Sequence, residues 1–155
     1  LDADLKTFSQ NNELAFTRYA DDLTFSSNTA ISKDTILEII QLIRQNNFEV
    51  NPQKLRLKTN NRKQTVTGLT VNEKVNVDRK LLKKIRAMLH DLTKNGVQLA
   101  VKKHFNTNYV DEKNTAKFIY RLEGYINFVG QVRGKTDSLY MKQKAALNSV
   151  FNIGK

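Results

Sequence analysis

Two adjacent aspartates, Asp21 and Asp22, stand in the stretch TRYADDLTFSS at residues 17–27. Carboxylates held side by side repel each other, and a divalent cation removes that conflict. Hard oxygen ligands of this kind suit Mg²⁺ or Mn²⁺, which keep some water and share other positions with substrate phosphates. A two-metal site then aligns an attacking hydroxyl with a leaving oxygen for phosphoryl transfer. The pair therefore indicates a metal site, with a solvated Asp-Asp turn as the alternative.

The sequence on either side predicts how the aspartates are held. Residues 14–27 partly alternate apolar and polar types, which favours a β-hairpin with the pair at or near its turn. Residues 32–47 predict a helix with Ser32 as its N-cap, because an isoleucine-rich stripe recurs at helical spacing. The aspartates would thus lie on a rigid element rather than on a loose loop.

Shorter strands are expected after this helix. Residues 48–50 and 54–59 each favour a strand, and a second hairpin is predicted from 64–71 and 75–77. Gly68 would lie inside a strand of that hairpin, which suggests a bulge or a close backbone approach.

Helices dominate the second half of the chain. Apolar residues recur at helical spacing over 79–94, 115–132 and 138–151, which predicts three amphipathic helices. Gly96 and Gly134 are the expected stops of the first two. Because strands give way to helices alone at about residue 79, we predict an α+β chain with its domain boundary there.

Charge and composition narrow the function. The chain has 155 residues and a formal net charge of +11. Residues 51–110 hold fourteen Lys and Arg against three acids, whereas acids outnumber bases in the first fifty residues. A basic surface of this size suits a polyanion such as nucleic acid. Without cysteine the chain has no disulfide, thiolate zinc site or cysteine nucleophile, and no apolar run is long enough to span a bilayer.

Four segments in order resemble one family. The stretch from Tyr19 to Asp22 resembles the Y-x-D-D motif of reverse transcriptases, and TRYADDLTFS is similar to bacterial retron-type enzymes in particular. The likeness continues through NPQKLRL at 51–57, VTGLTVNEKVNVDRKLLKKIRAMLHD at 66–91 and LEGYINFVG at 122–130. The resemblance implies the C-terminal part of a palm over residues 1–78, with the YADD and primer-grip hairpins, and an all-helical thumb over 79–155.

The resemblance also implies roles for single residues. Asp21 and Asp22 would be the metal ligands, and Lys54 would neutralise or protonate the departing pyrophosphate. Tyr19 would pack beneath the primer end, where the small Ala20 lets the terminus approach the metal. Ordinary strand packing for Tyr19 and solvent exposure for Lys54 are the plain alternatives.

Further residues would contact nucleic acid. The primer grip would include Val66, Thr67 and Gly68, a triplet that in retron enzymes is also implicated in choosing the cognate RNA; a simple strand with a bulge is the alternative. On the helix 79–94, four basic side chains share the face away from the apolar stripe and would follow the phosphates of a primer–template duplex. They are Lys83, Arg86, His90 and Lys94, and a solvated helix face is the alternative.

The family requires more than these residues supply. Its third metal carboxylate and its fingers lie upstream of Y-x-D-D, and only twenty residues precede Asp21 here. We therefore expect the C-terminal part of a cytoplasmic bacterial RNA-directed DNA polymerase, inactive alone. It would use Mg²⁺ or Mn²⁺, an RNA template, a DNA or RNA primer and deoxynucleoside triphosphates. The resemblance to retron enzymes also implies a role in antiviral defence. The alternatives are a non-catalytic RNA-binding module with a structural Asp pair and, third, a metal nuclease.

Overall fold

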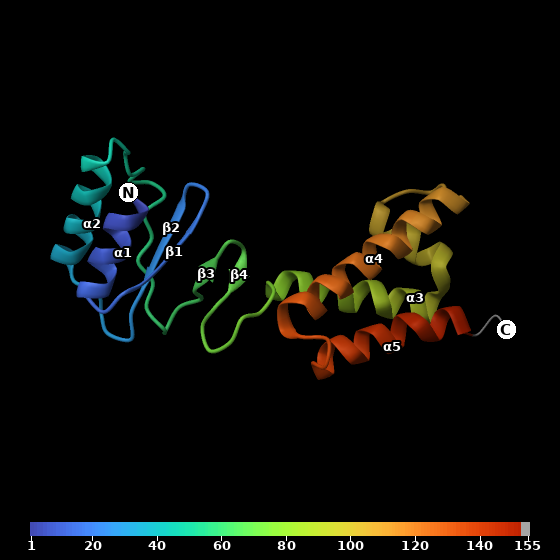
Figure 1. The fold of residues 1–155 in the computed structure, drawn as a ribbon. Coiled ribbons are helices and arrows are strands. Elements are labelled where there is room, and N and C mark those ends of the chain that lie inside the picture. The colour runs from blue at the N-terminus through green and yellow to red at the C-terminus, as the bar shows by residue number, and fades with distance from the viewer. Residues whose placement is uncertain (153–155) are drawn as a thin grey trace. The chain divides into compact units, whose positions relative to one another are not determined.

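The computed structural model describes residues 1–152, with side chains described through residue 150. The backbone divides into two compact units, Leu1–Thr67 and Gly68–Lys155. Five helices and two small two-stranded sheets make up the described chain (Figure 1). The predicted mixture of helix and strand is therefore confirmed, and the assignment of palm and thumb stays a prediction.

The first unit is built around one hairpin and two helices. Its elements are α1 (Asp2–Asn11), β1 (Ala15–Tyr19), β2 (Asp22–Ser26) and α2 (Lys33–Gln45). Leu5 of α1 and Ile39 and Ile43 of α2 are buried, and apolar residues of the hairpin pack against them. On the hairpin, the rings of Phe16 and Phe25 stack with centroids 5.0 Å apart. The helices thus support one face of the hairpin.

The hairpin and α2 confirm two predictions. The strands pair in antiparallel register from Ala15 opposite Ser26 to Tyr19 opposite Asp22. Only Ala20 and Asp21 remain for the turn, so the aspartates lie where the alternating pattern expected them. Ser32 is the N-cap of α2, and its hydroxyl accepts a hydrogen bond of 3.0 Å from the Thr35 amide. Helix α1 was not predicted.

The strands predicted at 48–50 and 54–59 are wrong, because both segments are irregular. The amides of Lys54 and Leu55 instead bond to the Asn51 carbonyl and form a turn. Alternation produces a strand only where a neighbouring strand and a core receive it. Here Leu55 and Leu57 are 50% and 63% exposed, and no described strand pairs with their segment.

The second hairpin is shorter than predicted and turns elsewhere. β3 (Thr65–Val66) pairs with β4 (Leu69–Thr70), and Thr67 and Gly68 form the turn with positive φ angles. Gly68 is therefore a turn residue and does not lie inside a strand, which corrects the expected bulge. Farther along, Thr70 and Asn76 exchange two backbone hydrogen bonds of 2.8 Å, close to the predicted pairing of 64–71 with 75–77.

The second unit is a bundle of three helices. They are α3 (Arg79–Phe105), α4 (Glu112–Arg133) and α5 (Ser138–Asn152). Helix α3 breaks at Gly96, where φ is 77° and ψ is 166°, as predicted; its second arm follows in a stretch with no clear pattern. Gly134 ends α4 as predicted. The core is apolar, and its largest fully buried residues include Phe118, Ile85, Met88, Leu122 and Ile126.

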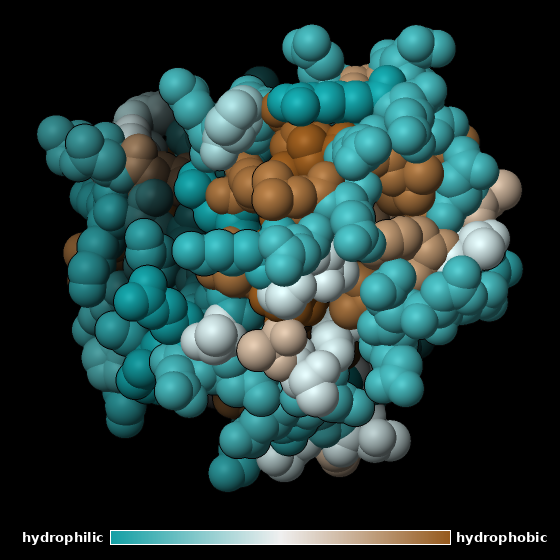
Figure 2. All heavy atoms as spheres, turned by 90° about the vertical axis from the view of Figure 1, so that its left-hand side faces the viewer, coloured by the Kyte–Doolittle hydropathy of each residue, from teal (hydrophilic) through white to brown (hydrophobic). Residues whose placement is uncertain are grey.

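Hydrophobic side chains also reach the surface of the first unit. Figure 2 looks at that unit and shows brown side chains gathered into a patch among hydrophilic ones. Leu37 of α2 and Phe48 after it are at least half exposed. Residues 1–67 therefore do not cover all of their own apolar surface. None of the helices within residues 1–152 is long and apolar enough to cross a membrane.

Candidate active site

The two aspartates occupy the tip of the β1–β2 hairpin. Asp21 is the second turn residue and Asp22 is the first residue of β2, and both are exposed. Within the described residues, neither carboxylate has a hydrogen-bond or ion-pair partner. The oxygens of both side chains are therefore available to a ligand from outside.

Tyr19 lies next to this pair. Tyr19 and Asp22 are directly opposite in the antiparallel register, so their side chains lie on the same face of the hairpin. The Tyr19 side chain is 72% exposed, whereas Phe16 and Phe25 face the core. The tip thus presents an aromatic ring and a carboxylate together on the face away from the helices.

The turn itself is conformationally unusual. Ala20 has a φ of 53°, in the left-handed region that costs an alanine about 1–2 kcal/mol. Two-residue hairpin loops normally place Gly, Asn or Asp at such positions. Arg18 contacts this turn, because its Nε donates a hydrogen bond of 2.7 Å to the Ala20 carbonyl. Sequence reasoning missed Arg18, although it directly precedes the motif.

The donor set suits a hard divalent cation but is incomplete. Asp21 and Asp22 supply carboxylate oxygens, the ligands preferred by Mg²⁺ and Mn²⁺. Across the described residues there is no group of three or more His, Asp or Glu side chains able to hold a metal. Asp2 does not form such a group with the pair, and its Oδ1 accepts a hydrogen bond of 2.7 Å from Arg18 Nη1. Residues 1–152 therefore supply two carboxylate ligands of a metal site and no third.

The other predicted catalytic and primer-contacting residues lie apart from the tip in sequence and element. Lys54 is exposed in the turn after α2, and no described hydrogen bond or ion pair links it to either aspartate. Val66 is half-buried in β3, and Thr67 and Gly68 are exposed in the turn that follows. A Cβ added to Gly68 would meet no atom within 4 Å, so its positive φ of 83° explains the glycine better than crowding does.

The four basic residues predicted to bind nucleic acid share the first arm of α3. Lys83, Arg86, His90 and Lys94 are all exposed, while Ile85, Met88 and Leu92 of the same arm are buried in the core. The polar face is therefore separated from the apolar one as the spacing predicted. His90 Nδ1 also lies 3.7 Å from Asp91 Oδ1.

A buried polar cluster was not foreseen. The Asp91 side chain is 4% exposed and accepts hydrogen bonds of 3.0 Å from Lys103 Nζ and 3.2 Å from Asn95 Nδ2, and His104 Nε2 lies 2.8 Å from it. The pKa of Asp91 is held below its ordinary 3.8, mainly by the hydrogen bond from Lys103 and also by that with His104. Burial of the carboxylate opposes this shift. Because Gly96 lies between these partners, the cluster joins the two arms of α3. No local pattern signals it.

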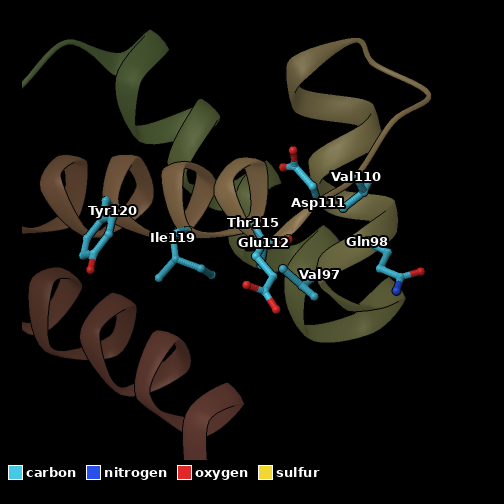
Figure 3. A pocket seen from close by; sticks show the side chains of 9 residues that line it. Val97, Gln98, Val110, Asp111, Glu112, Thr115, Ile119 and Tyr120 are labelled. Atoms are coloured by element: carbon cyan, nitrogen blue, oxygen red, sulfur yellow. The ribbon is translucent and has the colours of Figure 1, made fainter.

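One cleft of the second unit is lined by none of the predicted residues. It measures about 720 Å³ and opens between the second arm of α3 and the start of α4, as Figure 3 shows. Val97, Val110 and Ile119 give it an apolar floor, and Glu112 stands at its edge. Asp111 beside it is already the N-cap of α4, where its Oδ1 accepts a hydrogen bond of 2.6 Å from the Asn114 amide.

Comparison with known proteins shows what the chain resembles. Over 91 residues the chain is 35% identical to the Retron Mx65 reverse transcriptase of Myxococcus xanthus. The chain is similar to a retron reverse transcriptase. The resemblance predicted from the YADD motif is therefore confirmed. The aligned part is 58% of this chain and 21% of that reverse transcriptase, so the chain spans about a fifth of the curated relative. No protein-family model matches it.

Proposed function

We propose that the chain is a palm and thumb portion of a retron-type RNA-directed DNA polymerase, a nucleotidyltransferase. The observation that carries the proposal is the Asp21–Asp22 pair, exposed without partners at a rigid hairpin tip in a chain similar to a retron reverse transcriptase. The palm would extend to residue 78 and the helical thumb would begin at residue 79. The reaction would be attack of a primer 3′ hydroxyl on a deoxynucleoside triphosphate, directed by an RNA template, with release of pyrophosphate.

At the tip, each residue would have a separate task. Asp21 and Asp22 would hold Mg²⁺, or Mn²⁺ in its place, through their carboxylates, with Asp21 the more direct ligand. When bound, the metal supplies alignment of the hydroxyl and neutralisation of charge at the phosphate. Tyr19 would pack beneath the primer end, because its exposed ring shares a face with Asp22. The methyl of Ala20 is small enough to leave the terminus close to the carboxylates.

Two further elements would position the substrates. Lys54 would neutralise or protonate the pyrophosphate that leaves, a role for which its exposed ammonium group is suited. The hairpin that includes Val66, Thr67 and Gly68 would hold the primer backbone and take part in choosing the cognate RNA.

The basic face of α3 would bind the primer–template duplex. Its four exposed side chains, Lys83, Arg86, His90 and Lys94, lie on one helix face, and contacts with phosphates make affinity depend steeply on salt. Replacing Lys83 by Gln should lower the slope of log affinity against log salt by about one. Lys142→Gln, on the exposed side of α5, is the matched control and should leave the slope unchanged.

The polypeptide would act in the bacterial cytoplasm and, as retrons do, in antiviral defence. Alone, the 155 residues would not polymerise, because the described part provides two metal carboxylates and no third. The same incompleteness favours one rival, a non-catalytic RNA-binding module in which the Asp pair is structural.

Primer extension separates the two. In the full-length polypeptide that the gene encodes, Asp21→Asn should lower Mg²⁺-dependent extension on an RNA template by about 10²–10³-fold, the loss typical of one essential electrostatic contact. Asp34→Asn, a substitution of the same type at an exposed position on α2, should leave the rate near that of the parent. Extension at the normal rate by Asp21→Asn would contradict the proposal. Cleaved rather than lengthened strands would instead indicate a nuclease.

A further inference from the structure

One guanidinium group connects the hairpin turn to the neighbouring helix. Arg18 Nε donates to the Ala20 carbonyl at 2.7 Å, and Arg18 Nη1 donates to Asp2 Oδ1 at the same distance. We propose that Arg18 is a positioning residue that fixes the turn bearing Asp21, and that Asp2 holds Arg18 in place. The inference rests on the proposed function, because it assigns Arg18 a task at that same metal site.

The turn needs an external support. Ala20 has a φ of 53°, and a non-glycine residue in this region persists only where its surroundings enforce it. The Ala20 carbonyl oxygen belongs to the planar peptide that joins Ala20 to Asp21. Holding that oxygen therefore sets the plane of the peptide, and with it the direction from which the Asp21 side chain starts.

Asp2 makes the support directional. It is the first residue of α1, where a negative charge is favoured by the helix dipole, and α1 is anchored beside β1 through the fully buried Leu5. The hydrogen bond from a guanidinium to a carboxylate is charge-assisted and restricts where the guanidinium can lie. With Nη1 held by Asp2, Nε donates its hydrogen to the Ala20 carbonyl in the turn.

The ion pair between Arg18 and Asp2 contributes more to the geometry of the turn than to folding stability. The side chains of Arg18 and Asp2 are 33% and 63% exposed, and ion pairs this exposed add little to folding stability. A metal ligand is far more sensitive, because a displacement of about 1 Å can cost a site 10²-fold in rate. Loss of Arg18 should therefore change metal dependence while leaving the fold intact.

The test measures Mg²⁺ dependence in the full-length polypeptide that the gene encodes. Arg18→Gln should raise the Mg²⁺ concentration for half-maximal primer extension about tenfold, with an unchanged midpoint of thermal unfolding. Arg18→Lys keeps the charge but cannot make both contacts in the guanidinium plane, so its shift should be nearly as large. Asp2→Asn should shift the value by about twofold to threefold, since one contact of Arg18 remains. Arg44→Gln, an exposed arginine in the last turn of α2, is the matched control and should shift nothing.

Two results would overturn the inference. One is a half-maximal Mg²⁺ concentration for primer extension in Arg18→Gln equal to that of the parent. The other is complete rescue by Arg18→Lys, which would show that only a nearby positive charge is needed. The proposed function fails separately, if Asp21→Asn in the same polypeptide extends the primer normally.

Discussion

The substitution Asp91→Asn tests how the second unit holds its broken helix together. Asp91 lies before the break at Gly96, and its partners Lys103 and His104 lie after it. The change keeps the size of the side chain and removes its charge. It therefore weakens the link between the two arms of α3 without opening a cavity.

The expected loss follows from the exposure of each partner. A hydrogen bond to a charged group contributes about 1.5–3 kcal/mol when it is buried. His104 is 15% exposed, so its contact with Asp91 counts nearly in full. Lys103 is 66% exposed, and its contact is discounted to about 0.5–1 kcal/mol because solvent screens it. Since asparagine retains part of these hydrogen bonds, we expect the free energy of unfolding to fall by about 2 kcal/mol.

Urea unfolding followed by far-ultraviolet circular dichroism measures this loss, and hydrogen exchange of the amides near Met88 assigns it to α3. The matched control is Glu123→Gln, which also removes a carboxylate paired with a lysine, Lys144, at 2.6 Å. Its side chain is 39% exposed, so the loss should stay below about 1 kcal/mol. The reasoning would be refuted by equal losses in the two variants. It would also be refuted by a loss in Asp91→Asn of less than about 0.5 kcal/mol, which is no more than an exposed ion pair contributes.

Three further outcomes are expected. The pKa of Asp91 is held below its ordinary 3.8 in the folded protein, so its carboxylate stabilises the fold above pH 3.8. This stabilisation is lost as the pH falls through the lower, folded pKa. Acid titration followed by circular dichroism should therefore show a smaller loss of stability with falling pH in Asp91→Asn than in the parent. Gly130→Ala should lower the free energy of unfolding of the second unit by about 1–3 kcal/mol in urea, because the new Cβ would lie 2.6 Å from Cε2 of Tyr140. An unchanged free energy of unfolding would mean that the Tyr140 ring moves aside freely. Ser32→Ala should cost the first unit about 1 kcal/mol, seen as faster hydrogen exchange in the first turn of α2, because the Thr35 amide loses its cap.

Local chemistry explains why the hairpin tip and most helices could be predicted. The turn needs only a short alternating run on each side of Asp21 and Asp22, and α2 needs only its isoleucine stripe and Ser32. The roles of Tyr19 and Lys54 came from the family resemblance, and no contact in residues 1–152 tests them.

Longer-range contacts explain what was missed. The segment 54–59 alternates like a strand, yet nothing in the described chain pairs with it, so pattern alone was misleading. The Asp91 cluster unites residues 12 and 13 positions apart across a helix break, a spacing that no single helix brings together. Arg18 was overlooked because its partner Asp2 lies sixteen residues earlier, on a helix that was itself not predicted.

The central claim is that the tip formed by Asp21 and Asp22 binds a divalent cation. Ala20 lies between Tyr19 and Asp21 in the turn, so its methyl group is a reporter within the site. In the full-length polypeptide labelled at alanine methyl groups, Mn²⁺ should broaden the Ala20 signal. The Asp21→Asn, Asp22→Asn double variant should abolish the broadening. An Ala20 signal that stays sharp in the parent at millimolar Mn²⁺ would contradict the account.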